Sequence, residues 1–351
     1  MTHDIFGIEC DPAAARVHIL PVPYDATTSY RPGAARGPAA VLAASAQVDL
    51  CDADVGSPHE VGIHLHHAPS MVEERNRTAR AAAARVREAL DDGAKPPEDD
   101  VDLVNSLGNQ NNKDVYDWTR SMLEKGKLPV ILGGDHSVPF GAIRAVCEYY
   151  PDGIGLLHFD AHADLRDTYQ GFEDSHASIF NNVVAKLPKV TKLTQVGIRD
   201  FSHEELDLIK NSNGRIQTYF DRFLRDARFA GRMTQLAKSI VDTLPEHVYV
   251  SFDIDGLDPV LCPNTGTPVP GGVTFDEMVL IMSTLARSGK KIVGLDLCEV
   301  APPRDMKDDA LADLWDANVG ARVLYKLIGF ALMSHNEKCA TPPALPKPPG
   351  V

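Results

Sequence analysis

Apolar, β-branched runs alternate with amphipathic stretches along most of the 351-residue chain. The runs at residues 128–132 and 153–157 are almost continuously apolar, which is typical of strands covered on both faces of a parallel sheet. The predicted strands occupy residues 17–22, 128–132, 153–159, 193–198, 214–219, 247–252 and 291–297. The predicted helices occupy residues 38–46, 115–125, 140–148, 203–210, 230–243, 275–288 and 317–333. This alternation predicts one α/β domain over residues 1–340, with a mainly parallel sheet of about eight strands flanked by helices.

Two segments depart from the alternation. We interpret residues 65–115 as an insertion on the outside of the domain, combining an Arg- and Ala-rich helix at 73–91 with a polar, proline-containing stretch at 92–100. The tail at residues 341–351 holds five prolines, which predicts a disordered segment.

The composition is that of a globular protein, with 44% hydrophobic and 24% charged residues. No run of eighteen apolar residues occurs, so the sequence predicts no transmembrane helix. The net charge of −14 disfavours nucleic acid and anionic membranes as partners and favours a small cation. Six scattered cysteines without a C-x-x-C pair indicate reduced thiols and a cytoplasmic location.

Candidate metal ligands follow three of the predicted strands. In the motif Gly-Gly-Asp-His-Ser at residues 133–137, the paired glycines allow a sharp turn that directs His136 across the carboxyl edge of the sheet. In Asp-Ala-His-Ala-Asp at residues 160–164, Asp160, His162 and Asp164 share one face of an extended chain. Two carboxylates and an imidazole crowded together need a cation among them, which predicts a metal site.

The third motif, Ser-Phe-Asp-Ile-Asp-Gly-Leu-Asp-Pro at residues 251–259, adds Asp253 and Asp255 at the end of an apolar strand. Two histidines and four aspartates suit two divalent ions that share carboxylates and activate water. Oxygen ligands with imidazole favour Mn²⁺ and allow Ni²⁺, Fe²⁺ and Co²⁺, and the absence of cysteine argues against a structural zinc.

The fourth motif, Leu-Asp-Leu-Cys-Glu-Val at residues 295–300, contains Glu299 just past an apolar strand. This carboxylate could bind a cationic substrate. A helix-capping or salt-bridged glutamate is an equal alternative from the residues alone.

The four motifs, in this order, resemble those of the ureohydrolase family of arginases, agmatinases, guanidinobutyrases and guanidine hydrolases. The similarity extends from about residue 17 to residue 333 and implies the arginase-like fold. It also implies a binuclear metal site, with Mn²⁺ or Ni²⁺ as the two ions. One ion would be held by His136, Asp160, Asp164 and Asp253, and the other by Asp160, His162, Asp253 and Asp255, with Asp160 and Asp253 bridging.

The resemblance implies roles for three side chains. A metal-bridging hydroxide would attack the guanidinium carbon and release urea, or a urea derivative, with ammonium or an amine. Asp164 would orient the hydroxide, His176 would shuttle protons, and Glu299 would bind the guanidinium group. The resemblance further implies a homotrimer or homohexamer.

The sequence motifs indicate the family more specifically than they indicate the substrate. The stretch at residues 165–175 is similar to the agmatinase and guanidinase branches and differs from the arginase branch. We expect the polar segment at 105–114 to form a loop that closes over a small substrate such as guanidine or an N-alkylated guanidine or biguanide. The alternatives are a plain surface insertion, with agmatine as substrate, or a weakly active subunit of a paralogous hetero-oligomer. A one-zinc deacetylase-type enzyme would need paired histidines, whereas the Gly-Gly-Asp-His turn supplies one.

Overall fold

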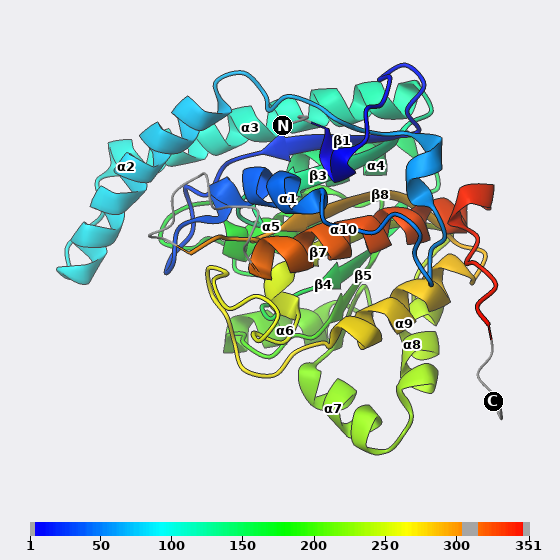
Figure 1. Ribbon diagram of the computed structural model, residues 1–351. Helices are drawn as coiled ribbons and strands as arrows, with labels where there is room; N and C mark the ends of the chain where they lie inside the picture. The colour runs from blue at the N-terminus through cyan, green and yellow to red at the C-terminus, as the bar shows by residue number, and fades with distance from the viewer. Residues whose placement is uncertain (1–3, 304–314, 347–351) are drawn as a thin grey trace.

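Eight strands form one sheet in which every hydrogen-bonded neighbour is parallel (Figure 1). The structure is a computed structural model that describes residues 4–303 and 315–346. The strands are β1 (Val17–Val22), β2 (Ile63–Leu65), β3 (Leu128–Gly133), β4 (Ile154–Phe159), β5 (Val190–Val196), β6 (Ile216–Tyr219), β7 (His247–Asp253) and β8 (Lys291–Cys298). Their order across the sheet is β2-β1-β3-β8-β7-β4-β5-β6, so β8, the last in sequence, lies between β3 and β7.

Helices cover both faces of the sheet, and each face has its own hydrophobic core. The helices are α1 (Gly37–Ser45), α2 (Val72–Asp91), α3 (Glu98–Glu124), α4 (Phe140–Tyr149), α5 (Ile179–Lys186), α6 (His203–Asn211), α7 (Asp221–Phe229), α8 (Met233–Asp242), α9 (Phe275–Ala286) and α10 (Trp315–Ser334). One core joins the sheet to α1, α8, α9 and α10, and the other joins it to α2, α3, α4 and α5. Both faces are therefore buried, as the apolar strands require.

The predicted α/β domain with a parallel sheet is confirmed, and all seven predicted strands are present. The strand at residues 17–22 has the predicted bounds, and the other six have shifted ends. The prediction missed β2, which has three residues and lies at the edge of the sheet beside β1. It also missed α5 and α7, which have eight and nine residues. Such short elements give little periodic signal in a sequence.

The expected loop at residues 105–114 is wrong, because these residues lie inside the 27-residue helix α3. The buried positions of α3 recur every three or four residues from Val104 to Met122, as in an amphipathic helix. Gly108 and Asn111 occupy two of these buried positions, so the apolar stripe was hidden in the sequence. Three acidic residues in the first turn favour the start of the helix after the proline-containing stretch.

Other expectations concern the tail, the cysteines and membrane spans. Residues 341–346 carry no helix or strand, and residues 347–351 of the predicted disordered tail lie outside the described residues. All six cysteines are free. Among the helices of the described residues, none has the length and apolar character needed to cross a membrane.

The aromatic pair at the centre of the sheet provides a test of the fold. Phe252 is fully buried against Phe159, with ring centroids 4.9 Å apart. Phe252→Ala should lower the free energy of unfolding by about 3–5 kcal/mol, because it removes buried contacts and leaves a cavity. Phe229 is 82% exposed, so Phe229→Ala should change it by less than about 0.5 kcal/mol. Urea denaturation of both variants measures the difference, and equal losses would contradict this core.

Candidate active site

Four neighbouring strands in the middle of the sheet carry the four sequence motifs at their carboxyl ends. The strands are β3, β8, β7 and β4, and each pairs in parallel with the next. His136 follows β3, Glu299 follows β8, Asp253 ends β7 and Asp160 follows β4. Because parallel strands end at the same edge, motifs separated by up to 163 residues converge at one place.

The first group of side chains surrounds His136. Its Nδ1 lies 3.0 Å from Asp160 Oδ2, 3.4 Å from Asp164 Oδ2 and 3.3 Å from Asp253 Oδ2. All four residues are buried. These are the four residues that the resemblance assigns to one ion.

The second group surrounds His162. Its Nδ1 lies 3.1 Å from Asp255 Oδ2 and 3.4 Å from Asp160 Oδ1. Asp160 therefore presents one oxygen to each group. The structure thus brings all six candidate ligands together around a shared carboxylate, and it places Asp253 nearest to the first group.

The chemistry of this donor set fits divalent cations. Within residues 4–303 and 315–346, the ion-pair partners of the four aspartates are histidines and not Lys or Arg. Burial and the neighbouring Asp255 and Asp160 raise the pKa of Asp253 well above its usual range. Burial and Asp160 likewise raise the pKa of Asp164 to about 7. Buried carboxylates whose side-chain partners are imidazoles, and not Lys or Arg, are stabilised when metal ions supply positive charge.

Backbone strain marks the same region. Asp164 and Glu299 have φ values of +53° and +61°, in the left-handed region that L-residues rarely adopt. Such conformations occur preferentially at functional sites, where the surrounding structure enforces them.

Glu299 is buried, and one of its carboxylate oxygens is free. Oε1 accepts a hydrogen bond of 3.1 Å from the backbone N–H of His136, whereas Oε2 has no partner. Burial, with Asp253 and Asp135 nearby, raises the pKa of Glu299 well above its usual range. A cation bound at Oε2 would stabilise the ionised form. The helix-capping and salt-bridge alternatives receive no support, because Glu299 caps no helix and pairs with no base among the described residues.

The backbone approaches the free oxygen closely at Gly266, where a side chain would be crowded. A Cβ atom built on Gly266 would lie 3.3 Å from Glu299 Oε2 and 3.5 Å from Thr28 Cγ2. The Thr28 hydroxyl is also buried without a partner. Both residues with an unpartnered polar atom, Glu299 and Thr28, therefore adjoin Gly266.

His176 lies in the loop before α5 and borders a cavity of about 150 Å³ together with His162 and Asp164. Its Nδ1 is 3.3 Å from Thr27 Oγ1, and its Nε2 is 3.5 Å from Ser29 Oγ. Burial, with His162 nearby, lowers the pKa of His176 to about 3, so the ring is neutral. A neutral imidazole at the wall of a small cavity can accept and release a proton.

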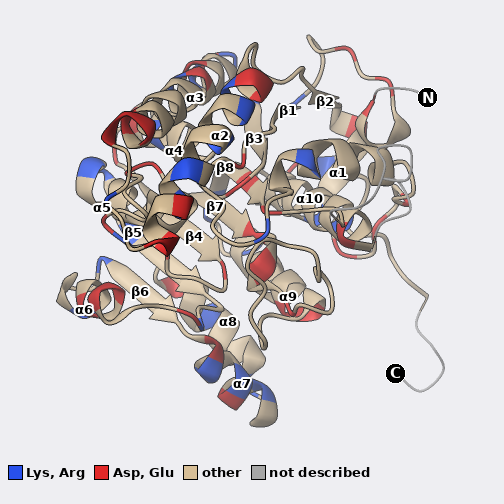
Figure 2. Cartoon of the chain, turned by 90° about the vertical axis from the view of Figure 1, so that its left-hand side faces the viewer, with Lys and Arg blue, Asp and Glu red and all other residues tan. Residues whose placement is uncertain are grey.

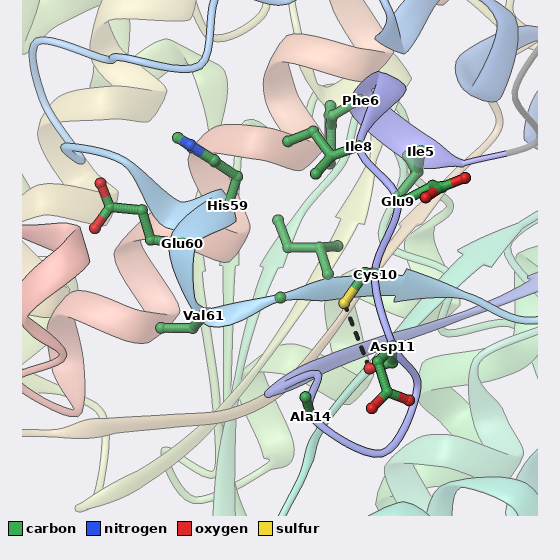
Figure 3. Close-up of a pocket in the computed structure, with 12 residues that line it drawn as sticks. Ile5, Phe6, Ile8, Glu9, Cys10, Asp11, Ala14, His59, Glu60 and Val61 are labelled. Carbon is green, nitrogen blue, oxygen red and sulfur yellow. Dashed lines mark hydrogen bonds between the residues drawn. The ribbon is translucent and has the colours of Figure 1, made fainter.

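A different cavity, of about 310 Å³, lies between residues 5–14 and 59–63 (Figure 3). It contains Cys10, whose thiol donates to the carbonyl of Asp11 at 3.6 Å. None of the residues predicted for the site lines it, so it is separate from the candidate active site.

His158, which was not among the predicted site residues, hydrogen-bonds to Asp160. His158 Nε2 lies 2.8 Å from Asp160 Oδ2, and the Gln195 side-chain amide donates to His158 Nδ1 at 3.2 Å. The Gln195 carbonyl oxygen in turn accepts from Thr218 at 2.9 Å, which orients the amide. Since Nδ1 accepts, Nε2 carries the proton and donates it to Asp160. The signal was available, because His158 precedes Asp160 by the two-residue period of a strand.

A second supporting chain begins at His136. Its Nε2 lies 2.9 Å from Ser251 Oγ, which donates to Asp296 Oδ1 at 3.1 Å. These bonds leave Nδ1 of His136 facing the aspartates. Hydrogen bonds of this kind fix the orientation of metal-binding histidines in proteins.

The comparisons with known proteins agree with this geometry. The sequence profile of the Arginase family matches residues 15–329. An N(1)-aminopropylagmatine ureohydrolase of Thermus thermophilus is 34% identical over 304 residues, which cover 85% of this chain and 87% of that protein. A guanidinopropionase of Pseudomonas aeruginosa is 30% identical and covers 91% and 87% of the two chains. The crystal structure of the agmatine ureohydrolase of Thermoplasma volcanium has the same fold, with a TM-score of 0.72, 21% identity and coverage of 96% and 97%.

The two groups around His136 and His162 predict the metal content. The purified protein should hold two divalent ions per chain. His136→Ala and Asp255→Ala should each lower this number to about one, because each removes a ligand from one group. His64→Ala, in the edge strand β2, is the matched control and should retain both ions. Elemental analysis after dialysis measures the content, and a single zinc in an active enzyme would contradict the binuclear site.

Proposed function

The chain belongs to the arginase family and is a hydrolase of guanidino C–N bonds, and we propose that its substrate is a small guanidino compound. Guanidine or an N-alkylated guanidine or biguanide would be cleaved to urea, or a urea derivative, and ammonium or an amine. Two divalent ions, Mn²⁺ or Ni²⁺, would take part.

The small size of the cavity beside His176 is the main support for this proposal. The cavity beside the His176 ring is small, with a volume of about 150 Å³. Its wall includes Arg166, whose guanidinium group lies 5.1 Å from the ring centre of Tyr169. In agmatine, a four-carbon amine chain would have to share this space with the guanidinium group, and its ammonium group would meet the positive charge of Arg166. A compact guanidinium cation avoids both costs.

Agmatine is the second candidate, and one observation favours it. Asp200 and Glu205 also line the cavity. Glu205 Oε2 is 4.0 Å from Arg166 Nε, but Asp200 is exposed and offers a carboxylate to an ammonium group. The Thermus thermophilus relative is named for an alkylated, amine-bearing guanidine, which is consistent with a polyamine substrate.

In the proposed mechanism, the two metal ions would activate water. Arginase-family enzymes use a binuclear metal site. The ions would be held by His136, Asp160, His162, Asp164, Asp253 and Asp255. When bound, they would supply the Lewis acidity that lets water act as a nucleophile at neutral pH.

Side chains of the protein would bind the substrate and transfer protons. Glu299 Oε2 would accept hydrogen bonds from the guanidinium group and fix the orientation of its central carbon. His176, which is neutral, would take up a proton at a ring nitrogen and deliver it to the leaving nitrogen. Thr27 and Ser29 would hold the ring at the cavity wall.

We further infer that the chain forms a homotrimer or homohexamer in the cytoplasm. The family resemblance supports the oligomer, and the six free cysteines support a reducing compartment. The complete set of ligands argues against a weakly active subunit of a paralogous hetero-oligomer.

A substrate panel tests the proposed function. Urea or amine release would be measured for guanidine, N-methylguanidine, agmatine, guanidinobutyrate and arginine, with Mn²⁺ and Ni²⁺ in separate series. We expect kcat/KM for guanidine or N-methylguanidine to exceed that for agmatine, because the cavity is small. Metal-stripped protein is the control. A preference for agmatine over guanidine by more than about tenfold would replace the first candidate with the second.

Glu299→Gln separates substrate binding from metal binding. The variant should keep its metal content and lose about 100-fold in kcat/KM, because losing a buried charge-assisted pair costs about 3 kcal/mol. Glu124→Gln, at the exposed end of α3, is the control and should leave kcat/KM unchanged. Loss of metal from the Glu299 variant would show that this residue supports the ions instead.

A further inference from the structure

The hairpin formed by α2 and α3 contacts the loops that surround His176. Helix α2 projects from the body of the molecule in Figure 1, and Figure 2 shows basic positions in blue along it. One of them, Arg87, is half-buried and donates two hydrogen bonds. Its Nε donates to Gln170 Oε1 at 3.0 Å, and its Nη2 donates to the carbonyl of Ala26 at 3.0 Å. One guanidinium group therefore connects two loops that are far apart in sequence.

Each of the two acceptors is adjacent to a residue that contacts His176. Ala26 precedes Thr27, whose hydroxyl accepts from the His176 backbone N–H at 3.1 Å and lies 3.3 Å from its ring. Gln170 follows Tyr169, whose ring packs edge-on against the His176 ring at 5.8 Å. The two loops thus form two walls of the space that holds the His176 ring.

We infer that Arg87 is a positioning residue, which holds the His176 ring in place by connecting these two walls. This inference rests on the proposed function, in which His176 transfers protons. We call the pair of bonds from Arg87 to Ala26 and Gln170 the Arg87 clamp.

The backbone on one side of the clamp needs such support. Gln170 has a φ of +57°, and Gly171 follows with a φ of +88°. A glutamine in the left-handed region is strained, so the bond from Arg87 helps to keep this turn in one conformation. Without the bond, the turn and the adjacent Tyr169 gain freedom to move.

The helix that carries Arg87 is itself fixed to the same loops. Arg80 pairs with the buried Asp25 at 2.6 Å, and Asp25 also accepts from the backbone N–H of Gly33 at 2.9 Å. On α3, the Asn105 side chain accepts from the backbone N–H of Glu173 at 3.0 Å. These contacts hold α2 and α3 in place relative to the two loops that the Arg87 clamp connects. The region expected to close over the site as a loop instead braces it as a helical hairpin.

The chemistry of the clamp is specific to arginine. Two donors that diverge from one planar group reach two acceptors at once, whereas a lysine ammonium reaches them less well because it is a single compact charge. Arg85, two residues earlier on α2, provides a matched control. It is exposed and pairs with Asp100 of α3 at 2.9 Å, so it links the two helices without contacting either loop.

The test compares Arg87→Met with Arg85→Met in the metal-loaded enzyme. Arg87→Met should lower kcat about tenfold to a hundredfold, because a misplaced proton-transfer group costs rate, while KM and metal content stay close to wild type. Arg87→Lys should recover part of the loss. On a His176→Asn background, Arg87→Met should lower kcat less than about twofold, because both changes disrupt the same function. Additive losses, or an equal loss with Arg85→Met, would overturn the inference.

Hydrogen exchange measured by mass spectrometry gives a readout that is independent of activity. Arg87→Met should speed amide exchange in residues 24–30 and 166–177, and Arg85→Met should not. Unchanged exchange in these loops would overturn the clamp even in an active enzyme. A wild-type protein that releases no urea from any guanidino compound would instead overturn the proposed function, and the exchange comparison would still test the clamp.

Discussion

The mutual repulsion of buried carboxylates is the constraint on which the centre of this molecule depends. Asp160, Asp164, Asp253 and Asp255 converge at the carboxyl edge of the sheet, with Glu299 beside them. Three imidazoles, those of His136, His158 and His162, are the side-chain partners of the aspartates within the described residues. The raised pKa values of Asp253 and Glu299 reflect a deficit of positive charge. The fold keeps these groups together through two cores and strained turns. Divalent cations and a cationic substrate are the ligands that such a deficit favours.

The convergence itself could be predicted from the sequence. Apolar runs identified the central strands, and the two-residue period placed Asp160, His162 and Asp164 on one face. Because buried strands of this type are parallel, their ends had to share an edge, and the motifs followed strands that proved to be neighbours. The order of the four motifs along the chain then indicated the family. The local sequence pattern was sufficient to predict the position of a candidate ligand wherever that ligand lay at the end of a long, apolar strand.

The surroundings of the site could not be predicted in the same way, because they depend on which distant segments become neighbours. The bond between His158 and Gln195 joins residues of β4 and β5 that are 37 positions apart. The contact of Arg87 with Gln170 spans 83 positions. The helix predicted at residues 115–125 is only the last part of α3, because Gly108 and Asn111 interrupt the apolar stripe of the earlier part. In the folded chain, Asn111 accepts a hydrogen bond from Arg75 of α2, and Gly108 lies against Asp174.

The position of β8 has a consequence for how the chain folds. Strands β3 and β7 do not pair with each other, and β8 is inserted between them after nearly 300 residues of the chain. Until that strand is available, both neighbours expose an unpaired edge, and the halves of the sheet that carry His136 and Asp253 remain unconnected. Contacts so distant in sequence form slowly. During synthesis, the ligand groups therefore assemble after most of the chain has left the ribosome, and the partly folded chain depends on protection of those edges from aggregation.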